Sequence, residues 1–88
     1  MEIKLHSTFK KLYKSRIAPN KKLVQQTGVR ISLFQSNRKN PSLKDHKLTG
    51  AKKELRAFSI SGDIRIVYRP ISDNEVIFLD IGSHNQVY

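Results

Sequence analysis

The chain has 88 residues, no cysteine and a formal net charge of +10. A chain of this length forms one domain around a small core, and without cysteine it can build neither a disulfide framework nor a thiolate metal site. No apolar run is long enough to span a membrane, and the first residues lack the apolar core of a signal peptide. We therefore expect a single cytoplasmic domain over residues 1–88, with no membrane partner.

The positive charge is concentrated in one part of the chain. Residues 1–56 hold 15 of the 17 Lys and Arg residues against three acids, whereas residues 57–88 hold two basic residues and four acids. A field this basic favours polyanions, through counterion release and electrostatic steering. Nucleic acid is the partner that this asymmetry favours, and an acidic protein partner would also fit it.

The first half of the chain predicts one strand and two helices. Residues 2–5 alternate in polarity, which indicates a short strand. Ser7 or Thr8 should cap a helix, since apolar residues then recur at spacings of three and four, namely Phe9, Leu12, Tyr13 and Ile17. Pro19 and Asn20 break the chain before a second helix that runs to about Ser36. Its buried stripe consists of Leu23, Thr27, Ile31 and Phe34.

The second half changes to a period of two. Residues 37–42 read as a loop, and strands are expected over residues 54–60, 64–69 and 75–81, separated by turns at 61–63 and 70–74. The predicted fold is α+β, with an antiparallel helical hairpin packed on one face of an antiparallel sheet in the order β-α-α-β-β-β. On the strand 64–69, Ile64, Ile66 and Tyr68 should face the helices. Asp63, Arg65 and Arg69 should then lie on the open face.

Two histidines stand in short polar segments that contain glycine. His46 lies in Leu-Lys-Asp-His-Lys-Leu-Thr-Gly (43–50), and His84 lies in the segment Asp-Ile-Gly-Ser-His-Asn-Gln (80–86). Imidazoles titrate near neutrality, so two of them on a basic chain could act as acid and base on a phosphodiester. A single loop histidine is more often a solvated side chain, and His6, which has no motif around it, is interpreted as structural or solvated. No spacing typical of metal ligands is present, so neither a metal nor another cofactor is expected.

Three motifs in this order of elements resemble the RelE/ParE superfamily of toxins, and most closely its YafQ-like branch. They are Lys-Asp-His-x-Leu-x-Gly (44–50), Gly-Asp-Ile-Arg-Ile-Val-Tyr (62–68) and Ile-Gly-Ser-His-x-x-Val-Tyr (81–88). The resemblance covers nearly the whole chain. It implies a toxin of a type II toxin–antitoxin system, acting as a metal-independent endoribonuclease on messenger RNA in the ribosomal A site. It also implies a cognate antitoxin, which should dock through an acidic segment.

The resemblance implies a catalytic set of His46, Arg65, His84 and Tyr88. His84 is the first choice for general acid, His46 is the base or a substrate-positioning group, and Arg65 acts on the scissile phosphate. Tyr88 either stacks on a base or covers the core. Six further side chains are expected to contact RNA or, for the lysines, to be merely solvated: Lys44, Lys47, Lys52, Lys53, Asp63 and Arg69.

Two positions depart from the pattern of the branch. Ser59 stands where a histidine is usual, and Asp80 stands where an arginine is usual, so Arg65, Lys52 or Lys53 would have to supply the missing charge. Arg65 could instead form an ordinary cross-strand ion pair with Asp80. Three other functions remain open: a ParE-like inhibitor of DNA gyrase, a catalytically weakened member that mainly binds antitoxin, and a generic RNA-binding domain.

Overall fold

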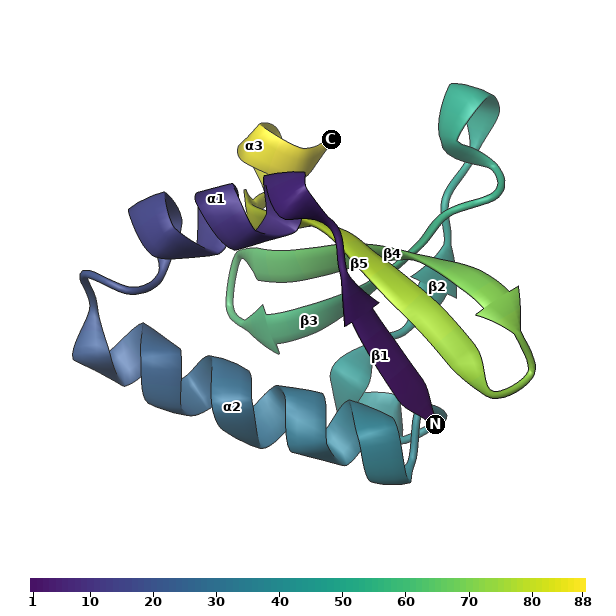
Figure 1. Cartoon of the computed structure of the whole chain (residues 1–88), viewed down its shortest axis with the longest axis horizontal. Helices are drawn as coiled ribbons and strands as arrows, with labels where there is room; N and C mark the ends of the chain where they lie inside the picture. The colour runs from purple at the N-terminus through teal and green to yellow at the C-terminus, as the bar shows by residue number, and fades with distance from the viewer.

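The fold is built on a mixed sheet with the strand order β1-β5-β4-β3-β2 (Figure 1). The structure is a computed structural model that describes all residues from Met1 to Tyr88. The strands are β1 (Glu2–Leu5), β2 (His46–Lys47), β3 (Arg56–Ser61), β4 (Ile64–Ser72) and β5 (Glu75–Ser83). Strands β2 to β5 pair antiparallel, whereas β1 pairs parallel with β5 and places Leu5 opposite Phe78. The predicted α+β class and the antiparallel meander are confirmed, and the parallel pair makes the sheet mixed.

Two longer helices follow β1, α1 (Ser7–Arg16) and α2 (Lys21–Ser36). The expected cap at Ser7 or Thr8 is wrong, because the Nδ1 atom of His6 accepts the backbone N–H of Thr8 at 3.0 Å. An imidazole nitrogen thus takes the place of the usual capping oxygen, which gives His6 a structural role. The cap of α2 is conventional, since the Oδ1 atom of Asn20 accepts the N–H of Leu23 at 3.1 Å.

Four short elements have no counterpart among the predictions: η1 (Pro41–Leu43), β2, η2 (Gly50–Lys52) and α3 (His84–Val87). Each is too short to show a period of hydrophobicity. The predicted turn at 70–74 is also wrong in extent. β4 continues through Pro70, which lies at a register shift against β5, and the turn narrows to residues 73–74. Proline, which cannot donate a ladder hydrogen bond, is tolerated at such irregular positions.

The main core lies between the two helices and one face of the sheet. Phe9, Ile17 and Phe34 are buried there against aromatic residues of the strands, and the rings of Phe34 and Phe58 stack at 4.3 Å. Ile66 and Tyr68 belong to this core and Ile64 packs against it, as predicted for the helix-facing side of β4. No helix combines the length and the apolar character that crossing a membrane requires.

A second, smaller cluster covers the opposite face of the sheet. Ala57 of β3, Val67 of β4 and Val87 of α3 are buried together, and Leu48 and Leu55 pack against them. These contacts hold α3 and the segment 48–55, which projects from the sheet in Figure 1, over the open face. The small cluster therefore brings the two histidine-bearing segments to one side of the domain.

Truncation of Phe34 tests how far the fold depends on the main core. Phe34→Ala removes a ring that contacts Phe58, Tyr68 and Phe78, and we expect it to lower the free energy of unfolding by about 3–5 kcal/mol. Urea denaturation measures this change. Val29→Ala on the exposed side of the same helix should change it by less than about 0.5 kcal/mol. Equal losses for the two variants would contradict the proposed position of the core.

Candidate active site

A buried carboxylate holds the segment that carries His46. The Oδ2 atom of Asp45 accepts the hydroxyl of Tyr68 at 2.7 Å, and its Oδ1 atom accepts Nε of Arg56 at 3.2 Å. Arg38 lies at 3.7 Å from the same carboxylate, whose side chain is 9% exposed. The backbone turns just before it, because Lys44 adopts the left-handed conformation with φ 52°. Asp45 thus fixes the direction in which the chain leaves this turn.

Tyr68 links that carboxylate to the core. Burial raises the pKa of Tyr68 well above its ordinary value of 10.0, and the hydrogen bond and negative charge of Asp45 raise it further. The hydroxyl is therefore protonated at neutral pH and donates to Asp45. Burial acts to lower the pKa of Arg56, but the charges and hydrogen bonds of Asp45 and Tyr68 together raise it above its ordinary value.

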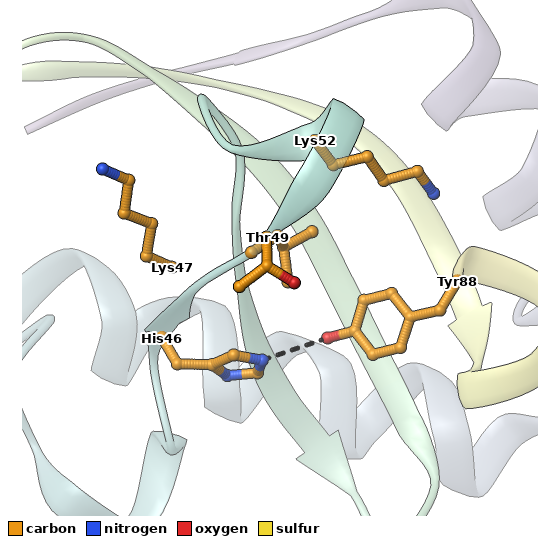
Figure 2. A pocket seen from close by; sticks show the side chains of 6 residues that line it. His46, Lys47, Thr49, Lys52 and Tyr88 are labelled. Atoms are coloured by element: carbon orange, nitrogen blue, oxygen red, sulfur yellow. Dashed lines mark hydrogen bonds between the residues drawn. The ribbon is translucent and has the colours of Figure 1, made fainter.

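His46 is exposed, but its ring is fixed by two contacts. Its backbone pairs with Ala57 of β3, and its Nδ1 atom lies 2.9 Å from the carbonyl oxygen of Lys44. A carbonyl oxygen can only accept, so Nδ1 must carry a hydrogen. In the neutral imidazole the lone pair is then on Nε2, which lies 3.4 Å from the hydroxyl oxygen of Tyr88 (Figure 2).

The second histidine belongs to α3 and not, as the sequence suggested, to a loop beyond the last strand. A capping box begins this helix, in which the Oε1 atom of Gln86 accepts the N–H of Ser83 at 2.8 Å. The Oδ1 atom of Asp63 accepts the backbone N–H of His84 at 3.3 Å, and Nζ of Lys52 donates to the carbonyl of Val87 at 2.8 Å. The short helix is therefore tied down at both ends.

Tyr88 stands between the two imidazoles. Its ring meets that of His84 edge to face, with centroids 4.6 Å apart, while its hydroxyl faces His46. Burial raises the pKa of Tyr88, and the positive charge of Arg65, on the same face of the sheet, acts to lower it. The structure thus brings all four predicted catalytic residues together, although His46 and His84 do not form a hydrogen bond with one another.

Arg65 lies on the open face of β4, opposite Ser59 on β3 and Gly82 on β5. Its Nε atom is buried and has no hydrogen-bond partner. The alternative ion pair of Arg65 with Asp80 is wrong, because Asp80 pairs with Nη1 of Arg16 at 3.4 Å. No carboxylate of the protein therefore pairs with the guanidinium of Arg65.

Three adjoining hollows contain most of the predicted RNA-binding residues. The first, of about 370 Å³, is lined by His46, Lys47, Leu48, Thr49, Lys52 and Tyr88 (Figure 2). The second shares Lys47 with it and adds Lys53, Glu54, Arg56, Arg69 and Pro70. The third shares Arg56 with the second and includes Lys44, Arg38 and Lys39. Asp63 lines none of them and instead contacts the backbone of α3.

Sequence reasoning missed the residues that position the site. Asp45 stands directly beside His46 in the first motif, but nothing in a single sequence indicates its long-range contacts with Tyr68, Arg38 and Arg56. The capping box of α3 was visible, because Ser83 is followed three residues later by Gln86. No sequence pattern indicated the hydrogen bond from Lys52 to Val87, since a lysine in a basic loop is normally solvated.

Similar folds occur in known toxins. The E. coli DinJ–YafQ toxin–antitoxin complex matches with a TM-score of 0.79 at 21% identity, covering 99% of this chain and 96% of that one. The YoeB/ParE toxin from Agrobacterium tumefaciens matches at 0.75 and 16% identity, covering 96% and 99%. A copper-bound mutant toxin from Helicobacter pylori matches at 0.76 and 26% identity, covering 100% and 99%. The fold is therefore that of the YafQ and YoeB/ParE toxins.

The family follows from the sequence match. Residues 1–88 match the model described as the bacterial toxin of type II toxin–antitoxin systems, YafQ. The chain belongs to this family, and the resemblance inferred from its three motifs is confirmed. No curated protein matches the chain.

The hydroxyl of Tyr68 gives the fold a specific response to alkali. The pKa of the Tyr68 hydroxyl is higher in the folded state than in the unfolded state. The hydroxyl therefore contributes its full stabilisation below pH 10, and this stabilisation is lost as the pH rises above that value. We expect Tyr68→Phe to make the fall in unfolding free energy above pH 10 shallower, by up to about 1.4 kcal/mol per pH unit. Urea titrations at a series of pH values measure the slope, with Tyr13→Phe as the control. An unchanged slope in Tyr68→Phe would contradict this assignment.

Proposed function

We propose that this toxin is a metal-independent endoribonuclease that cleaves messenger RNA on the ribosome. The observation that carries the proposal is the arrangement around Tyr88, which joins the imidazoles of His46 and His84 beside the unpaired guanidinium of Arg65. Paired imidazoles and a free cation are what acid/base cleavage of a phosphodiester needs. A protein that only binds gyrase has no use for them.

The reaction transfers the phosphorus from one oxygen to another. A base removes the proton of the 2′-hydroxyl, and the 2′-oxygen then forms a bond to phosphorus while the bond to the 5′-oxygen breaks. An acid protonates the departing 5′-oxygen. The products are a 2′,3′-cyclic phosphate and a 5′-hydroxyl, so no water enters the step. Charge on the phosphorane oxygens must be stabilised by a fixed cation.

The four catalytic residues fit these roles. His46 is the base, because its Nδ1 hydrogen is held by Lys44 and its Nε2 lone pair points toward Tyr88 and the first hollow. His84 is the acid, since its ring is exposed at the start of α3 while its backbone is held by Asp63. Arg65 supplies the cation. Tyr88, whose side chain is accessible, offers a ring on which a base can stack.

The basic hollows give the messenger a path away from the catalytic residues. Lys47 and Lys52 lie at the first hollow, Lys53 and Arg69 at the second and Lys44 at the third, so phosphates can be neutralised along a continuous line. Asp63, grouped with the RNA-binding residues on sequence grounds, acts in this proposal by positioning α3.

Substitution of His84 tests the function. Induced His84→Ala should cut messenger about 10²–10⁴-fold more slowly than the wild type, since it lacks the general acid. Primer extension on host messengers measures new 5′ ends, and in-frame cuts would indicate coupling to translation. His6→Asn removes a distant imidazole while keeping a capping oxygen, and should cut normally.

Other results would redirect the assignment. Undiminished cutting by His84→Ala would contradict its role as the acid. Growth arrest by the wild type without any cuts would favour gyrase inhibition, and no growth arrest would favour a weakened, antitoxin-binding member.

We also propose that a cognate antitoxin docks on this chain through an acidic, amphipathic segment. E. coli YafQ forms a toxin–antitoxin complex with DinJ. A groove of about 310 Å³ between α1 and α2 is lined mainly by apolar side chains, among them Leu5, Phe9, Tyr13 and Ile31. The lysines of the two helices form no ion pair, namely Lys10, Lys11, Lys14, Lys21 and Lys22. An apolar stripe flanked by carboxylates complements this surface.

A further inference from the structure

Gly82 marks a place where an arginine from α1 reaches the open face of the sheet. A Cβ atom on Gly82 would lie 2.5 Å from Oε1 of Gln86 and 2.7 Å from Nη1 of Arg16. Gly82 and Arg65 are cross-strand partners, so their side-chain positions point to the same face. The guanidinium of Arg16 therefore lies over Gly82, on the face that carries Arg65.

The end of β5 leaves room for this approach. β1 pairs with β5 only as far as Phe78, so the following residues of β5 have an uncovered edge on that side. Nη1 of Arg16 reaches over the edge and donates to the carbonyl of Ile81 at 2.9 Å and to Asp80 at 3.4 Å. Both contacts use Nη1 alone. The Nε and Nη2 atoms of Arg16 donate to no protein group.

Two guanidinium groups thus flank Gly82 with donors unused. Neighbouring strands are only about 4.8 Å apart, so the backbone separation between Arg65 and the glycine is small. Asp80 is the one carboxylate paired with either arginine, which leaves the cluster with a surplus of positive charge. Such a pair of forked donors is suited to adjacent phosphate groups of an extended polyanion.

We propose that Arg16 is a second phosphate-binding residue of the active site and holds the phosphate next to the one that Arg65 contacts. The proposal rests on the proposed ribonuclease function and deepens it. Asp80 holds the Arg16 guanidinium in place in the free protein, and phosphate competes with this carboxylate in the complex. A Cβ atom at position 82 would crowd Nη1 of Arg16 and the side chain of Gln86, which also covers Gly82, so glycine is the residue that lets the Arg16 guanidinium approach this face.

The alternative is that Arg16 and Asp80 form only a structural ion pair, and two substitutions separate the possibilities. Arg16→Gln and Asp80→Asn both break the pair, but only the first removes a phosphate ligand. We expect Arg16→Gln to lower kcat/KM on ribosome-bound messenger by about tenfold. Asp80→Asn should keep or raise kcat/KM, because it removes a competing charge. Lys4→Gln, which breaks an exposed ion pair with Glu75 and removes no residue of the proposed site, should stay within about twofold.

The salt dependence of RNA binding supplies a readout that a structural role would not change. Loss of one phosphate contact should reduce the slope of log affinity against log salt by about 1 in Arg16→Gln and leave it unchanged in Asp80→Asn. The probe is an uncleavable 2′-O-methyl RNA oligomer. An unchanged slope in Arg16→Gln, or an equal fall of kcat/KM in both variants, would overturn the proposal. If the wild type cuts no messenger, the proposed function fails, and the slope alone then decides the role of Arg16.

Discussion

Tyr68 is the residue through which the hydrophobic core supports the candidate active site. Its ring packs among Phe34, Phe58 and Phe78, while its hydroxyl donates to Asp45 outside the core. A buried carboxylate is tolerated only when it is paired, and Asp45 is paired by this hydroxyl and by Arg56. The position of His46 therefore depends on packing on the far side of the sheet. The exposed edge strand that carries His46 gains rigidity in this way without being buried itself.

The other half of the site depends on much weaker packing. α3 has four residues and buries one apolar side chain, Val87, in the small cluster with Ala57 and Val67. Its remaining restraints are three hydrogen bonds: Ser83 donates to Gln86, Asp63 accepts from the backbone of His84, and Lys52 donates to the carbonyl of Val87. A single turn of helix is unstable on its own, so these bonds decide whether His84 and Tyr88 are held at the site. The lysine also joins α3 to the segment that follows His46, which couples the two histidine-bearing parts.

The sequence was sufficient to predict the elements whose hydrophobicity has a clear period and to single out the residues within its three motifs. The stripe of α2 and the two faces of β4 were predictable, because each side chain's environment follows from its own period. The roles of Asp45, Arg16 and Lys52 were not, since each depends on partners 11 to 65 residues away. The cap at His6 was missed because an imidazole rarely serves there. The pairing of Asp80 was unpredictable for a related reason: its partner lies on a helix beyond the free edge of the strand.

The central claim is that the 2′-hydroxyl of the messenger is the nucleophile and that paired imidazoles move its proton. The most direct test compares ribosome-bound messengers that carry either ribose or 2′-deoxyribose at the cleaved nucleotide, with the purified toxin added to each. We expect cleavage of the ribose messenger, giving a 2′,3′-cyclic phosphate and a 5′-hydroxyl, and no cleavage of the deoxyribose messenger. Cleavage of the deoxy messenger, or a 5′-phosphate at the new end, would contradict the claim.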